Sequence, residues 1–154
     1  MLWVVADYTR IMRQVMYEST ASEELGHGNV FGIVAKSSAR NAADDLSGFL
    51  LFHEGRFLQL LEGEAEPLRA TLERVKRDPR HDDLKMLYDV EISERSFPKW
   101  TMRRISTSDA DAAMIFVAGQ HEGVLDPRIR TALERFLGLE SVPAGSRPSS
   151  RLSR

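Results

Sequence analysis

Two neighbouring apolar runs predict a β-hairpin in the first half of the chain. The runs cover Leu46 to His53 and Arg56 to Leu61, and only Glu54-Gly55 separates them. A two-residue connection suits a tight hairpin turn, because Gly readily adopts the positive φ that such turns require. The pattern therefore predicts two antiparallel strands joined by that turn.

The second run is apolar on both of its faces. Successive side chains of a strand point to opposite faces, so the run divides into Phe57, Gln59 and Leu61 on one face and Leu58 and Leu60 on the other. We therefore expect the sheet to be covered on both sides. The Gln59 amide lies among apolar neighbours and needs hydrogen-bond partners there.

Three further segments predict strands, and helical patterns fill the intervals. The strands are Arg13–Glu18, Leu84–Ile92 and a short one around Trp100–Ile105. One helix opens at Ser22. A second covers residues 64–78, where acids and a proline form the first turn and an Asp-Pro pair ends the pattern.

The resulting order is strand, helix, strand, strand, helix, strand, strand. This order is typical of a ferredoxin-like α+β fold, with a five-stranded mixed sheet and two helices on one face. Asp126-Pro127 starts a later helix with an apolar stripe, and Ala112–Val117 favours another, so we expect these C-terminal helices to cover the second face. The stripe consists of Ile129, Ala132, Leu133, Phe136 and Leu137.

These elements divide the chain into four parts. Residues 13–106 form the predicted domain, and residues 107–140 hold the cover helices. Residues 1–12 are either an N-terminal extension or the consequence of a start placed upstream of Met12. Residues 141–154 contain prolines, serines and arginines with almost nothing to bury, which predicts a disordered tail.

Composition then excludes several classes of protein. The chain has 154 residues, the usual size of one domain, and its lack of cysteine excludes disulfides, thiol nucleophiles and thiolate-bound metal or iron–sulfur sites. A net charge of −2 disfavours a general nucleic-acid binder. No apolar run is long enough for a membrane span, and residues 1–6 are too short for a signal-peptide core. We expect a soluble cytoplasmic protein.

Several motifs that could mark a site have simpler interpretations. Gly26, Gly28 and Gly32 resemble a dinucleotide-binding fingerprint, but their spacing is one residue too long. The four histidines lack the spacing of metal ligands, so we expect no metal. Asp44-Asp45 and Asp82-Asp83 are either paired acid–base carboxylates or, more simply, solvated turn residues. The motifs of common nucleotide hydrolases, zinc proteases and serine hydrolases are absent.

Three residues are harder to explain by structure alone. Tyr17 ends a predicted strand, Asn41 lies near the end of a predicted helix, and Gln59 lies inside a strand. Taken singly, each has a structural interpretation: a half-buried phenol, a helix C-cap and a satisfied amide. Their combination points to a site.

Around these residues the sequence resembles the BLUF domain, a small flavin-binding sensor of blue light found in bacteria and some algae. The run Gly-Arg-Phe-Leu-Gln-x-Leu-Glu-Gly is specific to that family, and it occurs here with four other matching segments in family order. The resemblance covers residues 13–106 and indicates the short, single-domain type. The five segments are Val15–Ser19, Arg40–Leu50, Gly55–Gly63, Asp78–His81 and Phe97–Met102.

The resemblance implies a non-covalent FAD between the helices that start near Ser22 and Pro67. FMN or riboflavin are alternatives, since the ring contacts are the specific ones. By the family pattern, Asn41 bonds the polar edge of the flavin ring, and Gln59 lies between Tyr17 and that ring.

The resemblance also implies roles for residues outside this central group. Trp100 and Met102 would occupy alternative inward positions on the last strand and relay the signal, with Met102 also contacting the flavin. Arg40 departs from the family, which often has Asn or His at that position. The remaining flavin contacts implied are Ser19, Arg40, Arg80 and His81.

The function implied is that of a photoreceptor and not of an enzyme. Light would move an electron and a proton from Tyr17 to the flavin and back, leaving Gln59 with changed hydrogen bonds. The signal would leave through a change in a homo-oligomer, a dimer by default, or in binding to a separate downstream protein. We expect no nucleic-acid or membrane partner. The alternative is a light-insensitive ferredoxin-like module that binds a small ligand or a protein.

Overall fold

A computed structural model describes residues 11–22, 40–101, 103–106, 109–120 and 125–139 of the chain. These residues contain both strands and helices, in groups that do not alternate regularly, which confirms the predicted α+β class. The elements in chain order are β1 (Met12–Ala21), β2 (Ser47–His53), β3 (Arg56–Glu64), α2 (Ala65–Lys76), β4 (His81–Ile92), β5 (Arg103–Ser106), α3 (Ala110–Gln120) and α4 (Pro127–Leu137).

The strands form one sheet in the order β4-β1-β3-β2-β5. β1 pairs antiparallel with β3 and β4, and β2 pairs antiparallel with β3, whereas the short β5 runs parallel to β2. The register between β1 and β4 shifts between Met16 and Tyr17. Such an irregularity locally breaks the alternation of faces, and accordingly Leu87 and Tyr88, although adjacent, both pack against the same core cluster.

The predicted hairpin between β2 and β3 is confirmed. The turn residues Glu54 and Gly55 have φ values of 50° and 75°, so both adopt the positive φ of a type I′ turn. Within β2, Gly48 has a φ of 146°, and a Cβ there would lie 1.9 Å from the Leu60 carbonyl oxygen. Only glycine fits this close approach of the two strands.

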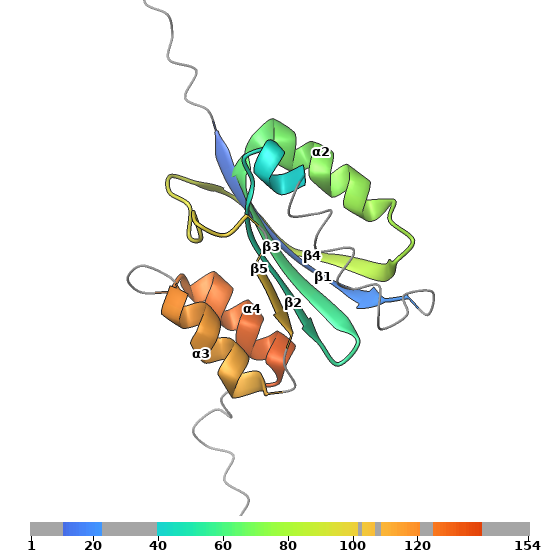
Figure 1. Ribbon diagram of the computed structural model, residues 1–154, viewed down its shortest axis with the longest axis vertical. Coiled ribbons are helices and arrows are strands. Elements are labelled where there is room, and N and C mark those ends of the chain that lie inside the picture. The colour runs from blue at the N-terminus through green and yellow to red at the C-terminus, as the bar shows by residue number, and fades with distance from the viewer. Residues whose placement is uncertain (1–10, 23–39, 102, 107–108, 121–124, 140–154) are drawn as a thin grey trace, which may run out of the picture.

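Helices cover both faces of the sheet, as the apolar character of both faces of β3 predicts. Figure 1 shows α2 on one side of the sheet and α3 with α4 on the other. The face toward α2 buries Val15, Leu61 and Leu68 in one core cluster. The face toward α3 and α4 buries a second, larger cluster, which includes Met16 and Leu133. The sheet therefore separates two cores.

The start of α4 follows the sequence prediction closely. The Asp126 side chain accepts a hydrogen bond from the Arg128 backbone N–H at 2.8 Å, and Pro127 occupies the first helical position. The helix ends at Gly138, whose φ of 70° is left-handed. All five residues of the predicted apolar stripe are buried.

Some predictions need correction and others concern residues outside the described ranges. Trp100 does not belong to the last strand, because β5 begins only at Arg103 and Trp100 lies in the preceding connection. The predicted strand beginning at Leu84 begins instead at His81. Most of the helix predicted from Ser22, as well as Met102, residues 1–10 and the predicted tail at 141–154, lies outside the described residues. Among the helices of the described ranges, none is long and apolar enough to cross a membrane.

Candidate functional site

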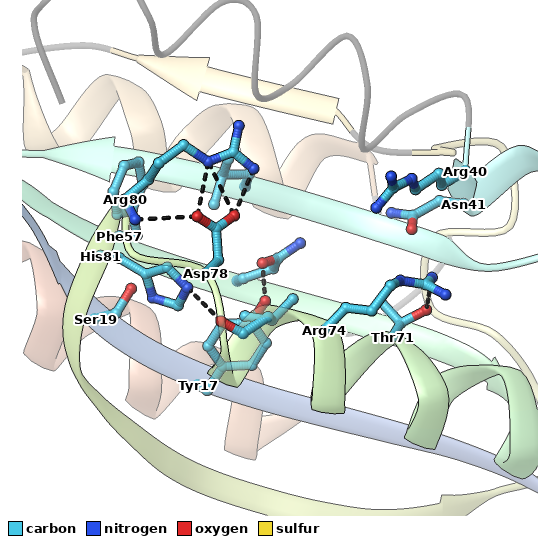
Figure 2. A pocket seen from close by; sticks show the side chains of 13 residues that line it. Tyr17, Ser19, Arg40, Asn41, Phe57, Thr71, Arg74, Asp78, Arg80 and His81 are labelled. Atoms are coloured by element: carbon cyan, nitrogen blue, oxygen red, sulfur yellow. Dashed lines mark hydrogen bonds and ion pairs between the residues drawn. The ribbon is translucent and has the colours of Figure 1, made fainter. Parts of the chain in front are cut away.

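A pocket with a cavity of about 120 Å³ opens on the face of the sheet toward α2. Its floor consists of residues from β1, β2 and β3, and its walls come from α2, from the residues that follow α2, and from the helical turn at residues 40–43. In Figure 2, Asp78, Arg80 and His81 lie toward one end of the pocket. The full lining is Tyr17, Ser19, Arg40, Asn41, Leu50, Phe57, Gln59, Thr71, Arg74, Val75, Asp78, Arg80 and His81.

A tyrosine and a glutamine on adjacent strands meet at the floor of this pocket. Tyr17 of β1 and Gln59 of β3 are register partners in the antiparallel ladder. The Tyr17 hydroxyl donates a hydrogen bond to Oε1 of Gln59. This contact supplies one of the hydrogen-bond partners that a polar amide needs in an otherwise apolar strand. Because the amide oxygen accepts from Tyr17, the amide nitrogen is the donor group of Gln59.

The environment of Tyr17 keeps its phenol protonated. The side chain is only 1% exposed. Burial, and secondarily the negative charge of Asp78, raise the pKa of Tyr17 well above its ordinary value of 10.0. At neutral pH the residue is therefore protonated and serves as a hydrogen-bond donor.

Charged side chains surround the pocket with more positive than negative charge. Arg80 binds Asp78 through Nε at 2.8 Å and 2.9 Å, and this contact lowers the pKa of Asp78. Arg74 binds the Thr71 hydroxyl at 3.0 Å and Asp44 at 3.3 Å. With Arg40 also on the wall, three guanidinium groups and one carboxylate line the pocket, which favours an anionic ligand.

Two buried polar atoms on the pocket wall lack a hydrogen-bond partner among the residues that the structure describes. The Asn41 residue is 2% exposed, and its Nδ2 has no partner in the described part of the chain. His81 Nε2 lies 2.7 Å from the Val75 carbonyl oxygen, while Nδ1 is buried without a partner among those same residues. A carbonyl only accepts, so Nε2 carries the hydrogen and Nδ1 of the neutral ring is an acceptor. Buried polar groups are rarely left unpaired, so this donor and acceptor fit a polar, planar ligand such as a flavin ring.

The structure brings most of the sequence-predicted site residues together, but not all. Tyr17, Ser19, Asn41 and Gln59 line the pocket, as do Arg40, Arg80 and His81. Trp100 does not line it: its ring packs in the core cluster toward α3 and α4, on the opposite face of the sheet. Met102 lies outside the described residues.

Three polar residues of the pocket wall were not predicted from the sequence. Thr71 and Arg74 lie one helical turn apart on α2, where their polar character suggests only an exposed helix face. Asp78 ends the helical pattern and resembles a simple turn residue, although an acid two positions before Arg80 is a recognisable signal for the pair that they form. Among the described residues, no cluster of potential ligands could hold a metal ion.

The family of the chain follows from comparison with known proteins. Residues 12–103 match the family described as "BLUF: Sensors of blue-light using FAD". The photoactivated adenylate cyclase subunit beta of Euglena longa is 31% identical over 87 residues, which are 56% of this chain and 10% of that protein. The subunit beta-like protein FB of Euglena gracilis is 31% identical over 138 residues, covering 86% of this chain and 16% of that protein. The chain thus spans only a small part of these relatives.

A solved structure has the same fold. Klebsiella pneumoniae BlrP1 with FMN and cyclic diGMP superposes with a TM-score of 0.75 at 25% identity, over 82% of this chain and 34% of that one. The family match covers more than half of the chain, and the family is described as sensors of blue light, as the sequence predicts for this domain. The chain belongs to the BLUF family, the sensors of blue light that use FAD.

Proposed function

We propose that this BLUF domain senses blue light through a Tyr17–Gln59 switch that reads the state of a bound flavin. The observation that carries the proposal is the hydrogen bond from the Tyr17 hydroxyl to Gln59 Oε1, in a pocket where buried atoms of Asn41 and His81 lack partners within the described ranges. Asn41 would donate through Nδ2 to a ring carbonyl, and His81 would accept through Nδ1. Ser19, 4% exposed on the pocket wall, would complete the contacts.

The chemistry of the switch balances without turnover of a substrate. When bound, FAD supplies a chromophore that blue light converts into a strong oxidant. Tyr17 gives up one electron and its hydroxyl proton, and it later receives both back. Gln59 accepts from the phenol and would also contact the ring, so it is the residue whose hydrogen bonds would differ after the cycle. The stored quantity is an altered amide orientation or tautomer, with the tyrosine restored.

The cations around the pocket support a phosphorylated flavin. Arg40 would attract the diphosphate of FAD, whereas Arg80 is already paired with Asp78 and Arg74 with Asp44. Riboflavin has no phosphate, so it would gain nothing from Arg40. BlrP1 was solved with FMN, in line with contacts that select the ring first and the phosphate second.

The outward surface of α3 is our proposed output surface. This helix of 11 residues is apolar on every side, although Ile115 is 72% exposed and Phe116 37% exposed. A soluble helix that is apolar all round is normally covered, which supports association with a second copy of the chain or with a downstream protein. A two-fold homodimer is the default expectation, and the compartment that we propose is the cytoplasm.

The test begins with the visible spectrum of the purified protein and chromatography of the released cofactor. We expect the bands of oxidised flavin and release of FAD, and a small reversible red shift after blue light. Gln59→Ala should retain flavin, because the ring contacts of Asn41 and His81 remain, but should lose the red shift. Colourless protein that does not take up added FAD, or a normal red shift in Gln59→Ala, would contradict the proposal.

A further inference from the structure

The strongest feature outside the pocket is a buried carboxylate on the opposite face of the sheet. Glu62 ends the inward-facing series of β3 and is 0% exposed. Its two oxygens accept four hydrogen bonds, and none of the four donors is a cation. The donors are the Ser47 hydroxyl at 3.3 Å and the Phe97 backbone N–H at 2.6 Å for Oε1, and Gln14 Nε2 at 3.0 Å and the Ser96 backbone N–H at 2.9 Å for Oε2.

These donors come from three separate parts of the chain. Gln14 lies on β1, Ser47 lies on β2, and Ser96 with Phe97 lies in the connection between β4 and β5. A carboxylate has about four acceptor positions, and all of them are occupied here. Glu62 therefore fixes that connection to β3 through two consecutive backbone groups, and it does so with charge-assisted hydrogen bonds, which are stronger than neutral ones.

The connection held by Glu62 leads to the proposed output surface. The Phe97 ring stacks on Trp100 with centroids 5.1 Å apart, and Trp100 stacks on Phe116 of α3 at 5.8 Å. The Trp100 carbonyl also accepts a hydrogen bond of 2.7 Å from the Gly48 N–H of β2. An unbroken series of contacts thus joins Glu62 to an exposed residue of α3.

Glu62 is also close to the proposed switch along the chain and across the ladder. It lies three residues after Gln59 on β3, and its register partner Gln14 lies three residues before Tyr17 on β1. The odd spacing places the Tyr17–Gln59 pair and the Gln14–Glu62 pair on opposite faces of the same two strands. A shift of β3 at Gln59 therefore displaces Glu62 on the other side of the sheet.

We propose that Glu62 is the positioning residue that carries a change at Gln59 through the sheet to the 93–101 connection, and from there by Phe97 and Trp100 to Phe116 of α3. This inference rests on the proposed function, because it assigns the route by which the switch is read. It also corrects the sequence-based relay: Trp100 acts from the far face, through ring stacking, and not from beside the flavin.

The first part of the test concerns dark protein, where the position of the connection can be measured without light. Amide hydrogen exchange of Ser96 and Phe97 should become at least about tenfold faster in Glu62→Gln, because an amide offers one acceptor oxygen where the carboxylate offers two. Tyr88→Phe is the matched control. It removes a 2.8 Å hydrogen bond to Gln14 at the far end of the same network and leaves the Glu62 contacts with the connection in place. Unchanged exchange in Glu62→Gln, or equal acceleration in Tyr88→Phe, would overturn the assignment.

The second part compares light with dark by exchange across residues 93–101 and 110–120. The parent and Tyr88→Phe should show a light-dependent change in both segments, whereas Glu62→Gln should keep the flavin red shift and lose that change. A retained light response in Glu62→Gln would overturn the route while leaving the proposed function intact. A parent without any red shift would instead overturn the proposed function, and the route with it. If Glu62→Gln does not fold, Glu62→Asp, which keeps the charge but is one methylene shorter, is judged by the same two readouts.

Discussion

The two faces of the sheet each contain a tyrosine that donates to a glutamine, Tyr17 buried and Tyr88 partly buried, yet the two pairs lie in different surroundings. On the pocket face Tyr17 donates to Gln59, and nearby polar atoms of Asn41 and His81 have no hydrogen-bond partner among the described residues. On the other face Tyr88 donates to Gln14, which in turn donates to Glu62 and Ser96. The same pair is part of a saturated network on one face and of an incomplete one on the other.

This difference indicates that one network stabilises the fold, whereas the other can bind a ligand. A saturated buried network fixes one arrangement, because every change in it leaves a donor or an acceptor unpaired. An incomplete network leaves its last partners to a ligand, and a ligand whose electronic state changes can then select a different arrangement. The pKa of both tyrosines is raised mainly by burial, so acidity does not distinguish them. What distinguishes them is that Tyr17 lies near buried atoms of Asn41 and His81 that have no hydrogen-bond partner among the described residues.

The largest expected effect is on the light response of the two tyrosine variants. Tyr17→Phe should bind flavin and lose the red shift completely. The substitution removes the phenolic proton, and a phenylalanine side chain is harder to oxidise than a tyrosine side chain. Tyr88→Phe should respond as the parent does. The check is the light-minus-dark absorption spectrum of each variant, and a red shift in Tyr17→Phe or its loss in Tyr88→Phe would reverse the roles of the two faces.

A second comparison concerns stability in the absence of flavin. Glu62→Ala should lower the free energy of unfolding by about 3 kcal/mol, because it leaves buried donors unpaired. Gln59→Ala removes one hydrogen bond beside an open pocket, and it should cost only about 1 kcal/mol. Urea unfolding measures both values, provided that the dependence of the unfolding free energy on urea concentration is the same in the variants and the parent. Similar losses of unfolding free energy in the two variants would show that the hydrogen bonds on the pocket face stabilise the fold as much as those on the other face.

A third comparison concerns the affinity for flavin. Asn41→Ala should weaken FAD binding about tenfold to a hundredfold, which corresponds to about 1.4 to 2.7 kcal/mol, because it removes a buried donor that no described residue of the chain accepts from. Ser47→Ala is a matched control, since Ser47 is equally buried but bonds to Glu62 on the other face. Titration of flavin-free protein with FAD, followed by fluorescence, gives both dissociation constants. An equal loss of affinity in the two variants would show that the two faces of the sheet do not differ in flavin binding.

The smallest effect is expected at alkaline pH. Burial raises the pKa of Tyr17 and Tyr88 in the folded protein above the ordinary value of 10.0, so the unfolded state releases these protons first as the pH rises. Stability is therefore fully present below pH 10 and falls above it, by about 1 kcal/mol for each tyrosine near pH 11. Each Phe variant should flatten the decline of unfolding free energy by the same amount. A decline unchanged in both variants would contradict burial of the phenols.

The sequence predicts the parts of the fold that local patterns determine. The Glu54-Gly55 turn needs positive φ at both positions, and the Asp126-Pro127 pair supplies a helix cap, so both features follow from residue chemistry alone. The apolar character of both faces of β3 correctly predicts two covered faces. The combination of Tyr17, Asn41 and Gln59 indicates a site, but only the family resemblance assigns each of them a role in it.

The parts that the sequence does not predict depend on long-range contacts. Glu62 follows two leucines and resembles an exposed strand end, although its position two residues after Leu60 already places it on an inward face. What makes its burial possible is the distant 93–101 connection, whose backbone donors no local pattern reveals. Trp100 was assigned to a strand for the same reason, since its place depends on stacking between Phe97 and Phe116.

The central claim is that light changes hydrogen bonds on the pocket face and leaves the flavin oxidised. The most direct measurement is the visible spectrum of the parent protein before, during and after blue light. The account predicts that all flavin bands move slightly to longer wavelength without loss of intensity and return in the dark. Bleaching of the bands, which indicates net reduction, or a spectrum that does not change with light, would contradict it.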